Sequence, residues 1–232
     1  MRGHVVVATA ALVFLGLTEA SAQSSRARTL FRPRSFEIDV GGAWQGRVPL
    51  GATSAPLTGN QGPPSVDLFD VDSQIDAFPS FDARLAFHLT RAFAVEGGFR
   101  YAQPKLATRI TADFEDAPDI TAVNSFSQYA FELNGVLHLN ALRFGRSVPF
   151  IFGGGGYLRE LYSGREIVET GQTIQAGIGI KQLLRRSSRG LIRSLGVRAD
   201  ARFYGRRKGV ELEEDEPLRT YGAASAALIV GF

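Results

Sequence analysis

The stretch FDARLAFHLTRAFAVEGGFRY, residues 81–101, decides the fold. Apolar residues occupy every second position within 81–89 and again within 93–101, which is the period of a β-strand and not of a helix. The sequence therefore predicts two strands joined by a tight turn at 90–92, the second running on towards Ile110. Charged residues alternate with the apolar ones: Asp82, Arg84, Glu96 and Arg100.

The same alternation predicts six further strands, at 36–45, 130–139, from Val148 onward, 168–181, 195–204 and 223–232. The strand from Val148 contains Gly153 to Gly156, so its facing stays open between Phe150/Phe152 and Ile151/Tyr157. No helical crossover is available for a parallel sheet. Predicted loops are long at 47–80, 113–124, 161–167 and 206–218, and shorter at 90–92, 140–147 and 184–192. This pattern predicts an all-β protein, an eight-stranded antiparallel up-and-down β-barrel.

Alternation alone fits both a soluble barrel with an apolar inside and a membrane barrel with an apolar outside. Without the strand from Val148, whose facing is open, the apolar faces of the strands carry no charged residue, whereas the opposite faces carry six acids and five bases. These are Glu37, Asp39, Asp82, Glu96, Glu132 and Asp200 with Arg84, Arg100, Lys181, Arg198 and Arg202. An eight-stranded barrel is just wide enough to be filled by side chains, so near-balanced charges can pair inside it. Aromatic residues near strand ends, such as Trp44 and Tyr101, suit membrane interfaces. We therefore predict a transmembrane barrel with a lumen charge network.

The first residues predict export from the cytoplasm. Arg2 precedes an apolar stretch from Val5 to Leu17, and Ala20-Ser21-Ala22 follows as a small-residue cleavage pattern. An anchor helix is disfavoured because this stretch is too short to cross a bilayer. The predicted organisation is a signal peptide at 1–22, a mobile polar lead at 23–34 and the barrel domain at 35–232.

Composition excludes several classes of protein. The 232 residues contain no cysteine, so disulfide frameworks, thiolate zinc sites and cysteine nucleophiles are ruled out. The net charge is only +3, and the basic clusters at 185–193 and 206–208 are interpreted as solvated turns. The first of these clusters lacks the interleaved aromatic residues that would stack on bases, so no nucleic-acid partner is expected.

Candidate chemistry is sparse. His88 and His138 fall on the inward face near the short turns and are interpreted as lumen filler. Asp70, Asp72 and Asp76 faintly resemble a calcium loop, but the glycine and the bidentate glutamate that such a loop needs are missing. The acidic run at 211–216 reads as solvated, and the glycine run at 153–156 lacks the context of a phosphate loop. We expect no catalytic residue, cofactor site or metal site, and no enzymatic activity.

The chain resembles the small bacterial outer-membrane β-barrels and is similar to the transmembrane domain of outer-membrane protein A. The resemblance covers roughly residues 35–232 and rests on three features. These are the signal peptide, the eight alternating segments and the ending Ala-Ala-Leu-Ile-Val-Gly-Phe, with Leu228 and Val230 on the face of Phe232. It implies that Phe232 belongs to the terminal signal read by the barrel-assembly machinery.

The functional expectation is an outer-membrane barrel with a structural or surface-interaction role exerted through its long loops. Two alternatives remain, a narrow porin-like channel and a lipid-A-modifying barrel enzyme. The expected partners are outer-membrane lipid and lipopolysaccharide, together with the assembly machinery and periplasmic chaperones during biogenesis. The barrel is expected to be a monomer.

Overall fold

The computed structural model describes residues 33–57, 66–111, 118–162, 168–187, 190–207 and 218–232. Eight strands close into an antiparallel barrel in the spatial order β1-β12-β11-β10-β9-β8-β5-β4, as the sequence predicts. Their bounds are β1 (Ser35–Gln45), β4 (Phe78–His88), β5 (Phe93–Ala102), β8 (Ser127–His138), β9 (Ser147–Leu161), β10 (Val168–Arg186), β11 (Ser194–Arg207) and β12 (Arg219–Gly231). The predicted signal peptide and nearly all of the polar lead lie outside the described residues.

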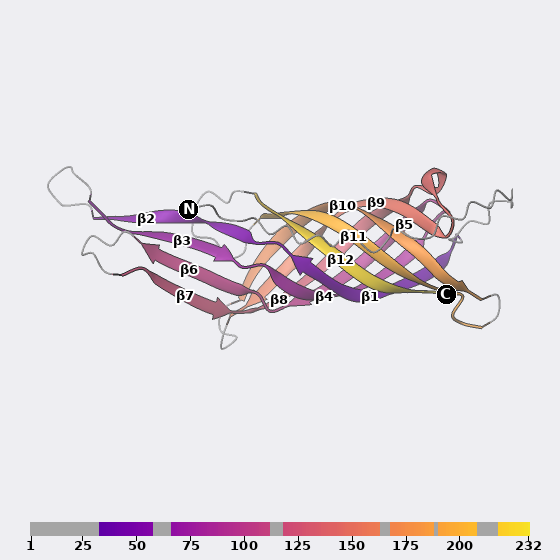
Figure 1. Ribbon diagram of the computed structural model, residues 1–232, viewed down its shortest axis with the longest axis horizontal. Helices are drawn as coiled ribbons and strands as arrows, with labels where there is room; N and C mark the ends of the chain where they lie inside the picture. Colours follow the sequence, from indigo (N-terminus) through magenta and orange to yellow (C-terminus); the bar gives the residue numbers. More distant parts are fainter. Residues whose placement is uncertain (1–32, 58–65, 112–117, 163–167, 188–189, 208–217) are drawn as a thin grey trace.

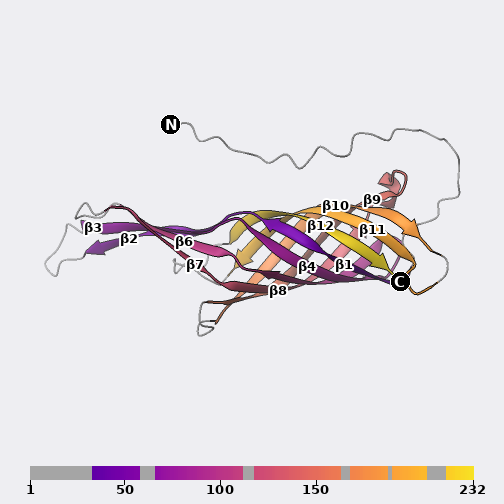
Figure 2. The same ribbon diagram turned by 60° about the horizontal axis from the view of Figure 1, so that its bottom comes forward.

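A second, four-stranded sheet projects from one end of the barrel (Figures 1 and 2). It contains β2 (Val48–Leu57), β3 (Val66–Ile75), β6 (Lys105–Thr111) and β7 (Ile120–Ser125), in the order β2-β3-β6-β7. This order follows that of β1, β4, β5 and β8 in the barrel, so one side of the wall continues outward as a sheet. The predicted loops 47–80 and 113–124 are therefore wrong in part, and the predicted extension towards Ile110 is present as β6.

Proline explains why β2 escapes detection in the sequence. Pro49 and Pro56 lie within β2, and proline normally disqualifies a strand because it lacks a ladder donor. In the structure β2 is an edge strand, paired only with β3, and the register shifts between Pro49 and Gly51 and again between Ser54 and Pro56. Edge position and irregular register together accommodate both prolines.

The other end of the barrel carries the short connections, and we call it the turn end. The β4–β5 turn is held by the Thr90 hydroxyl, which accepts hydrogen bonds from the backbone N–H groups of Ala92 (3.2 Å) and Phe93 (2.9 Å). The β8–β9 connection includes a short 3₁₀ helix, η1 (Asn140–Leu142). Among the described residues, no helix is long and apolar enough to cross a membrane. The opposite end, with the projecting sheet, is the loop end.

The structure settles the facing of β9. Phe150 and Phe152 are buried inside the barrel, whereas Ile151 and Tyr157 are exposed on its outer wall. The two phenyl rings occupy space beside Gly179 and Gly177 of the neighbouring strand β10, where no side chain competes with them. These glycines therefore make room for aromatic side chains within a narrow lumen.

Substituting one of these glycines tests the tightness of the interior. A Cβ atom at Gly179 would lie 2.6 Å from the carbonyl oxygen of Ala199 and 2.7 Å from Cβ of Asp200. We expect Gly179→Ala to lower the free energy of unfolding by about 1–3 kcal/mol, measured by urea titration in detergent. Gly97→Ala is the matched control, because a Cβ there meets nothing within 4 Å. Equal unfolding midpoints for the two variants would contradict this packing.

Candidate functional site

Charged side chains fill the interior of the barrel. All eleven charged residues that the sequence places on the inward faces are buried, at 8% exposure or less, and each takes part in at least one ion pair. They come from six of the eight barrel strands: β1, β4, β5, β8, β10 and β11. A seventh strand, β12, contributes Ser225, whose hydroxyl accepts hydrogen bonds from Arg84 and Arg202. The pairs form successive layers along the barrel axis.

Arg198 of β11 is the centre of a layer that lies inside the barrel, between its two ends. Its guanidinium lies 2.9 Å from Asp39 of β1 and 2.8 Å from Asp200, and it also pairs with Glu96 of β5. The guanidinium stacks over the ring of Phe150, with 4.6 Å between its central carbon and the ring centroid. Arg198 thus connects strands on opposite sides of the barrel.

Two further arginines occupy the next layer towards the loop end. Arg84 pairs with Asp82 at 2.6 Å and Asp200 at 3.5 Å, and Arg202 pairs with the same two carboxylates at 3.3 Å and 2.5 Å. Both arginines donate hydrogen bonds to the Ser225 hydroxyl of β12. The two arginines thus share two carboxylates, and Asp200 also pairs with Arg198, so it links this layer to the one before it.

The layer nearest the turn end contains Lys181 paired with Glu37. The Nε2 atom of His88 lies 3.4 Å from the same carboxylate, and the rings of His88 and His138 lie 5.3 Å apart. Both histidines are buried inside the barrel at the turn end, as the alternation predicts. Neither faces the outer wall, so neither reaches a molecule packed against the exterior.

Two layers lie near the loop end. Arg100 pairs with Glu132 at 3.2 Å and stacks on Tyr204, 4.6 Å from its ring centroid. Beyond them, Arg206 pairs with Glu160 at 2.5 Å. The interpretation of Arg206 as part of a solvated turn is wrong, because the residue is buried and continues the inward alternation of β11. Arg206 lies an even number of residues after Arg198 and Arg202, so its side chain falls on the same face of the strand. This spacing is the sequence signal that could have identified it.

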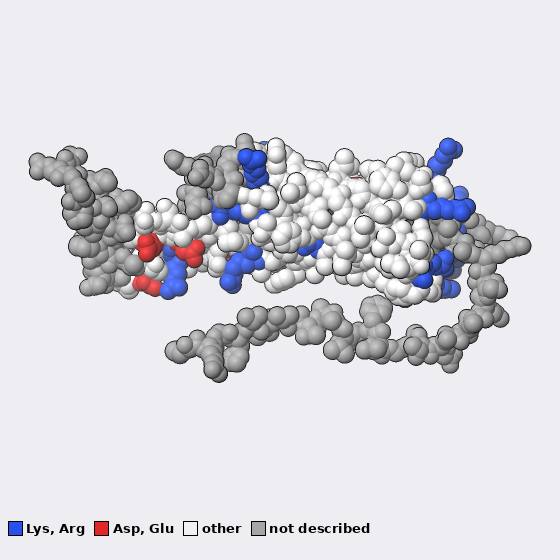
Figure 3. Space-filling view, turned by 90° about the horizontal axis from the view of Figure 1, so that it is seen from above, with Lys and Arg blue, Asp and Glu red and all other residues white. Residues whose placement is uncertain are grey.

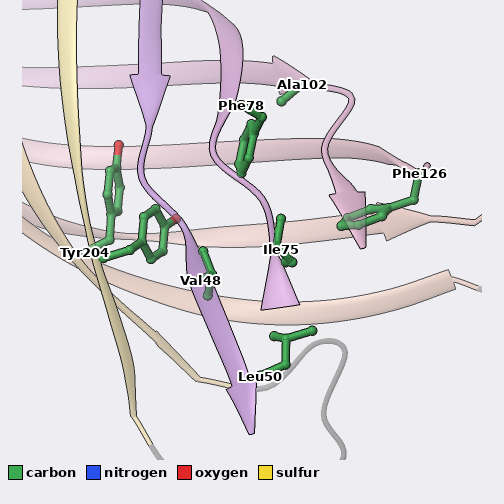
Figure 4. Close-up of a cluster of buried hydrophobic side chains, with 8 residues drawn as sticks. Val48, Leu50, Ile75, Phe78, Ala102, Phe126 and Tyr204 are labelled. Carbon is green, nitrogen blue, oxygen red and sulfur yellow. The ribbon is translucent and has the colours of Figure 1, made fainter. Parts of the chain in front are cut away.

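An apolar cluster closes the barrel interior where the projecting sheet begins (Figure 4). Its members come from both sheets and from the junction between β7 and β8: Val48, Leu50, Ile75, Phe78, Ala102, Phe126, Tyr204 and Tyr221. The rings of Tyr204 and Tyr221 stack with centroids 4.9 Å apart. The Tyr204 hydroxyl accepts hydrogen bonds from Arg100 and Arg202, so the cluster directly adjoins the ion pairs. The sequence gives no sign of it, since half of its members fall in segments expected to be loops.

The outer wall has the opposite character. Ile178 and Leu228 are each 65% exposed, and many other large apolar side chains of the barrel strands are exposed with them. On the face that Figure 3 shows, the middle of the barrel is almost free of charged side chains, and Lys and Arg lie at its two ends. A water-soluble barrel would expose its charges and bury these side chains; a barrel in lipid does the reverse. The protein is therefore a small transmembrane β-barrel that spans the bilayer with eight strands.

Comparison with known proteins gives structural matches only. No family model matches the sequence, and no curated protein matches it. Among solved structures, the outer membrane protein OprG from Pseudomonas aeruginosa is 8% identical, with a TM-score of 0.48 over 86% of this chain and 95% of that one. The attachment invasion locus protein Ail of Yersinia pestis is 11% identical, with a TM-score of 0.41 over 86% and 99%. The N-terminal β-barrel domain of Pseudomonas aeruginosa OprF is 11% identical, with a TM-score of 0.36 over 86% and 98%.

The remaining sequence candidates lie apart from the interior. Phe232 follows β12 at the turn end, and its backbone N–H donates to the carbonyl of Phe36 at 2.9 Å. Asp70 and Asp72 belong to strand β3 and not to a calcium loop. Within the described part of the chain, no group of three or more metal-ligating side chains could hold an ion. The acidic run at 211–216 lies outside the described residues.

Removing the Arg198 guanidinium tests the buried ion pairs. Arg198→Ala would leave Asp39, Glu96 and Asp200 without their shared cation. We expect the free energy of unfolding in detergent to fall by up to about 3–5 kcal/mol.

The control for this variant is Arg109→Ala in the projecting sheet. Arg109 pairs with Asp119 at 2.6 Å, but both side chains are more than half exposed. We therefore expect an effect of only about 0–1 kcal/mol. An unchanged unfolding midpoint for Arg198→Ala would show that the barrel does not depend on this cation.

Proposed function

We propose that the protein is a sealed outer-membrane barrel with a structural and surface-interaction role. The observation that carries this proposal is the succession of ion-pair layers capped by an apolar cluster along one lumen. An ion crossing the barrel would have to displace paired side chains at several depths. The lumen then serves as a packed core and not as a pore.

The energetics of buried charges support a closed lumen. An ionised side chain taken out of water must be paired and hydrogen-bonded, because its desolvation is otherwise too unfavourable. Arg198, Arg84 and Arg202 each have at least two carboxylate partners. Transient opening would separate several of these pairs together. The layered arrangement therefore favours the sealed barrel over the narrow porin-like channel.

The projecting sheet is the surface that we assign to interaction. In small barrels of this class the longer connections face the cell exterior. Asp72 on β3 lies opposite Arg109 on β6, on the face turned away from the buried cluster, whereas Ile75 packs into that cluster. The edge strand β7 is exposed along its whole length, Ile120 to Ser125. A polar face and an open strand edge are features by which a rigid sheet can bind a partner.

We further propose that the protein is not an enzyme. The buried histidines face the lumen at the turn end, away from any lipid substrate packed on the wall. Contacts with lipopolysaccharide, and recognition of the Phe232 end by the assembly machinery and chaperones, belong to the same proposal.

Planar-bilayer recording tests the sealed lumen. We expect no discrete conductance steps from the purified, refolded barrel in concentrated potassium chloride, because ion pairs occupy the lumen at several depths. Heat-dependent gel migration of the same sample verifies that the barrel is folded and inserted. Reproducible steps from verified protein would reject the sealed barrel in favour of the narrow channel.

Lipid-A mass spectra test the absence of catalysis. Spectra from cells with and without the protein should be identical in acylation and in headgroup. A mass change that depends on the protein would establish the enzymatic alternative. Loss of that change in a His88→Ala variant would then place the chemistry at the buried histidines.

A further inference from the structure

Exposed acidic side chains of the described residues are confined to one end of the molecule, whereas exposed arginines occur at both ends. At the turn end the described chain carries seven arginines, contributed by four separate segments: Arg34, Arg91, Arg143, Arg146, Arg185, Arg186 and Arg193. The described carboxylates that reach the surface lie at the loop end or on the projecting sheet: Asp70, Asp72, Asp76, Asp119 and Glu169. Figure 3 shows this difference on the face in view, with blue alone at the end opposite the sheet.

The choice of residue at the turn end is also restricted. The connecting segments 89–92, 139–146 and 184–193 contain no aspartate, glutamate or lysine, so arginine is their only charged residue. Guanidinium groups form paired hydrogen bonds with phosphate and carboxylate oxygens, whereas an ammonium group acts as a point charge. The turn end is thus suited to bind oxyanions.

Large apolar side chains are interleaved with these arginines. Leu142, Phe144 and Leu191 are 63%, 58% and 78% exposed on the turns themselves. Side chains of this kind beside arginine are typical of the membrane interface, where apolar groups enter the acyl region and guanidinium groups reach the headgroups. A water-filled compartment alone gives no reason to expose them.

One cleft combines both kinds of side chain. It lies at the β10–β11 connection, has a volume of about 260 Å³, and is lined by Arg185, Ser187, Ile192, Arg193, Ser194 and Leu195. The backbone hydrogen bonds from Ser187 N to Arg193 O and from Arg193 N to Gly231 O, both 2.8 Å, fix its walls. Two guanidinium groups and two hydroxyls supply donors for a phosphate, and Ile192 and Leu195 supply a contact for an acyl chain.

We propose that this cleft binds the headgroup phosphate of an anionic phospholipid in the periplasmic leaflet, and that the surrounding arginines form a rim for the same lipids. The proposal rests on the outer-membrane barrel described above but not on the lumen being sealed. Anionic cell-wall peptides could also meet a basic rim, but they would not use the apolar side chains between the arginines. The rim would thereby fix the depth of the turn end in the membrane.

Native mass spectrometry of the refolded mature chain tests the cleft. The protein in detergent receives equal amounts of phosphatidylglycerol and phosphatidylcholine. We expect a preference for phosphatidylglycerol of about tenfold, falling to near unity in the Arg185→Gln/Arg193→Gln variant. The control is Arg47→Gln/Arg159→Gln, which removes two exposed arginines from the loop end and should keep the preference.

Each outcome decides the proposal. The proposal would be overturned if the wild type, the Arg185→Gln/Arg193→Gln variant and the control all showed the same ratio of phosphatidylglycerol to phosphatidylcholine binding. It would also be overturned if the Arg185→Gln/Arg193→Gln variant kept its lipid preference but lost binding to purified cell-wall sacculi. The arginines would then recognise the cell wall and not the lipid. Heat-dependent gel migration confirms that each variant is folded. Conductance of the wild-type barrel, which would reject the sealed lumen, leaves the lipid preference unaffected.

Discussion

The guanidinium of Arg198 is held by carboxylates from β1, β5 and β11, and the rest of the barrel depends on such pairs. The outer wall of the barrel faces acyl chains and is apolar, and in membrane barrels the faces that point inward are the polar ones. The inward faces therefore carry charges, and the free energy of desolvating those charges requires that each be paired. Pairing across the lumen also joins strands that share no backbone ladder.

The width of the barrel makes this arrangement possible. Eight strands leave an interior that side chains can fill, so guanidinium groups reach carboxylates on the opposite wall. Glycines of β10 make room for Phe150 and Phe152, whose rings lie beside Arg198. The narrow lumen is thus a core in which ion pairs and aromatic rings replace the aliphatic side chains of a soluble domain.

The two ends of the molecule differ in both shape and charge. Four strands continue beyond the barrel at the loop end, where the apolar cluster lies between the projecting sheet and the ion pairs. The turn end is compact, and its exposed charge is arginine. The same chain therefore presents a polar sheet on one side of the membrane and an arginine rim interleaved with apolar side chains on the other. The two ends of the barrel are therefore two distinct surfaces.

The sequence by itself determined the eight barrel strands and the eleven inward charges, because a period of two assigns each residue of a strand to one face, and lipid excludes charge from the other. Only the tertiary structure decided which charges pair, because pairs such as Arg198 with Glu96 join strands whose register local sequence does not encode. It alone revealed β2, since the prolines that argue against a strand there are tolerated at a sheet edge. It alone showed that Phe150 faces inward, because a run of four glycines has no alternation of apolar and polar residues. In the fold, Gly179 and Gly177 leave the space that the rings of Phe150 and Phe152 occupy. The cluster around Tyr204 and Ile75 likewise required the fold, because its members are distant in sequence and meet only where the sheet leaves the barrel.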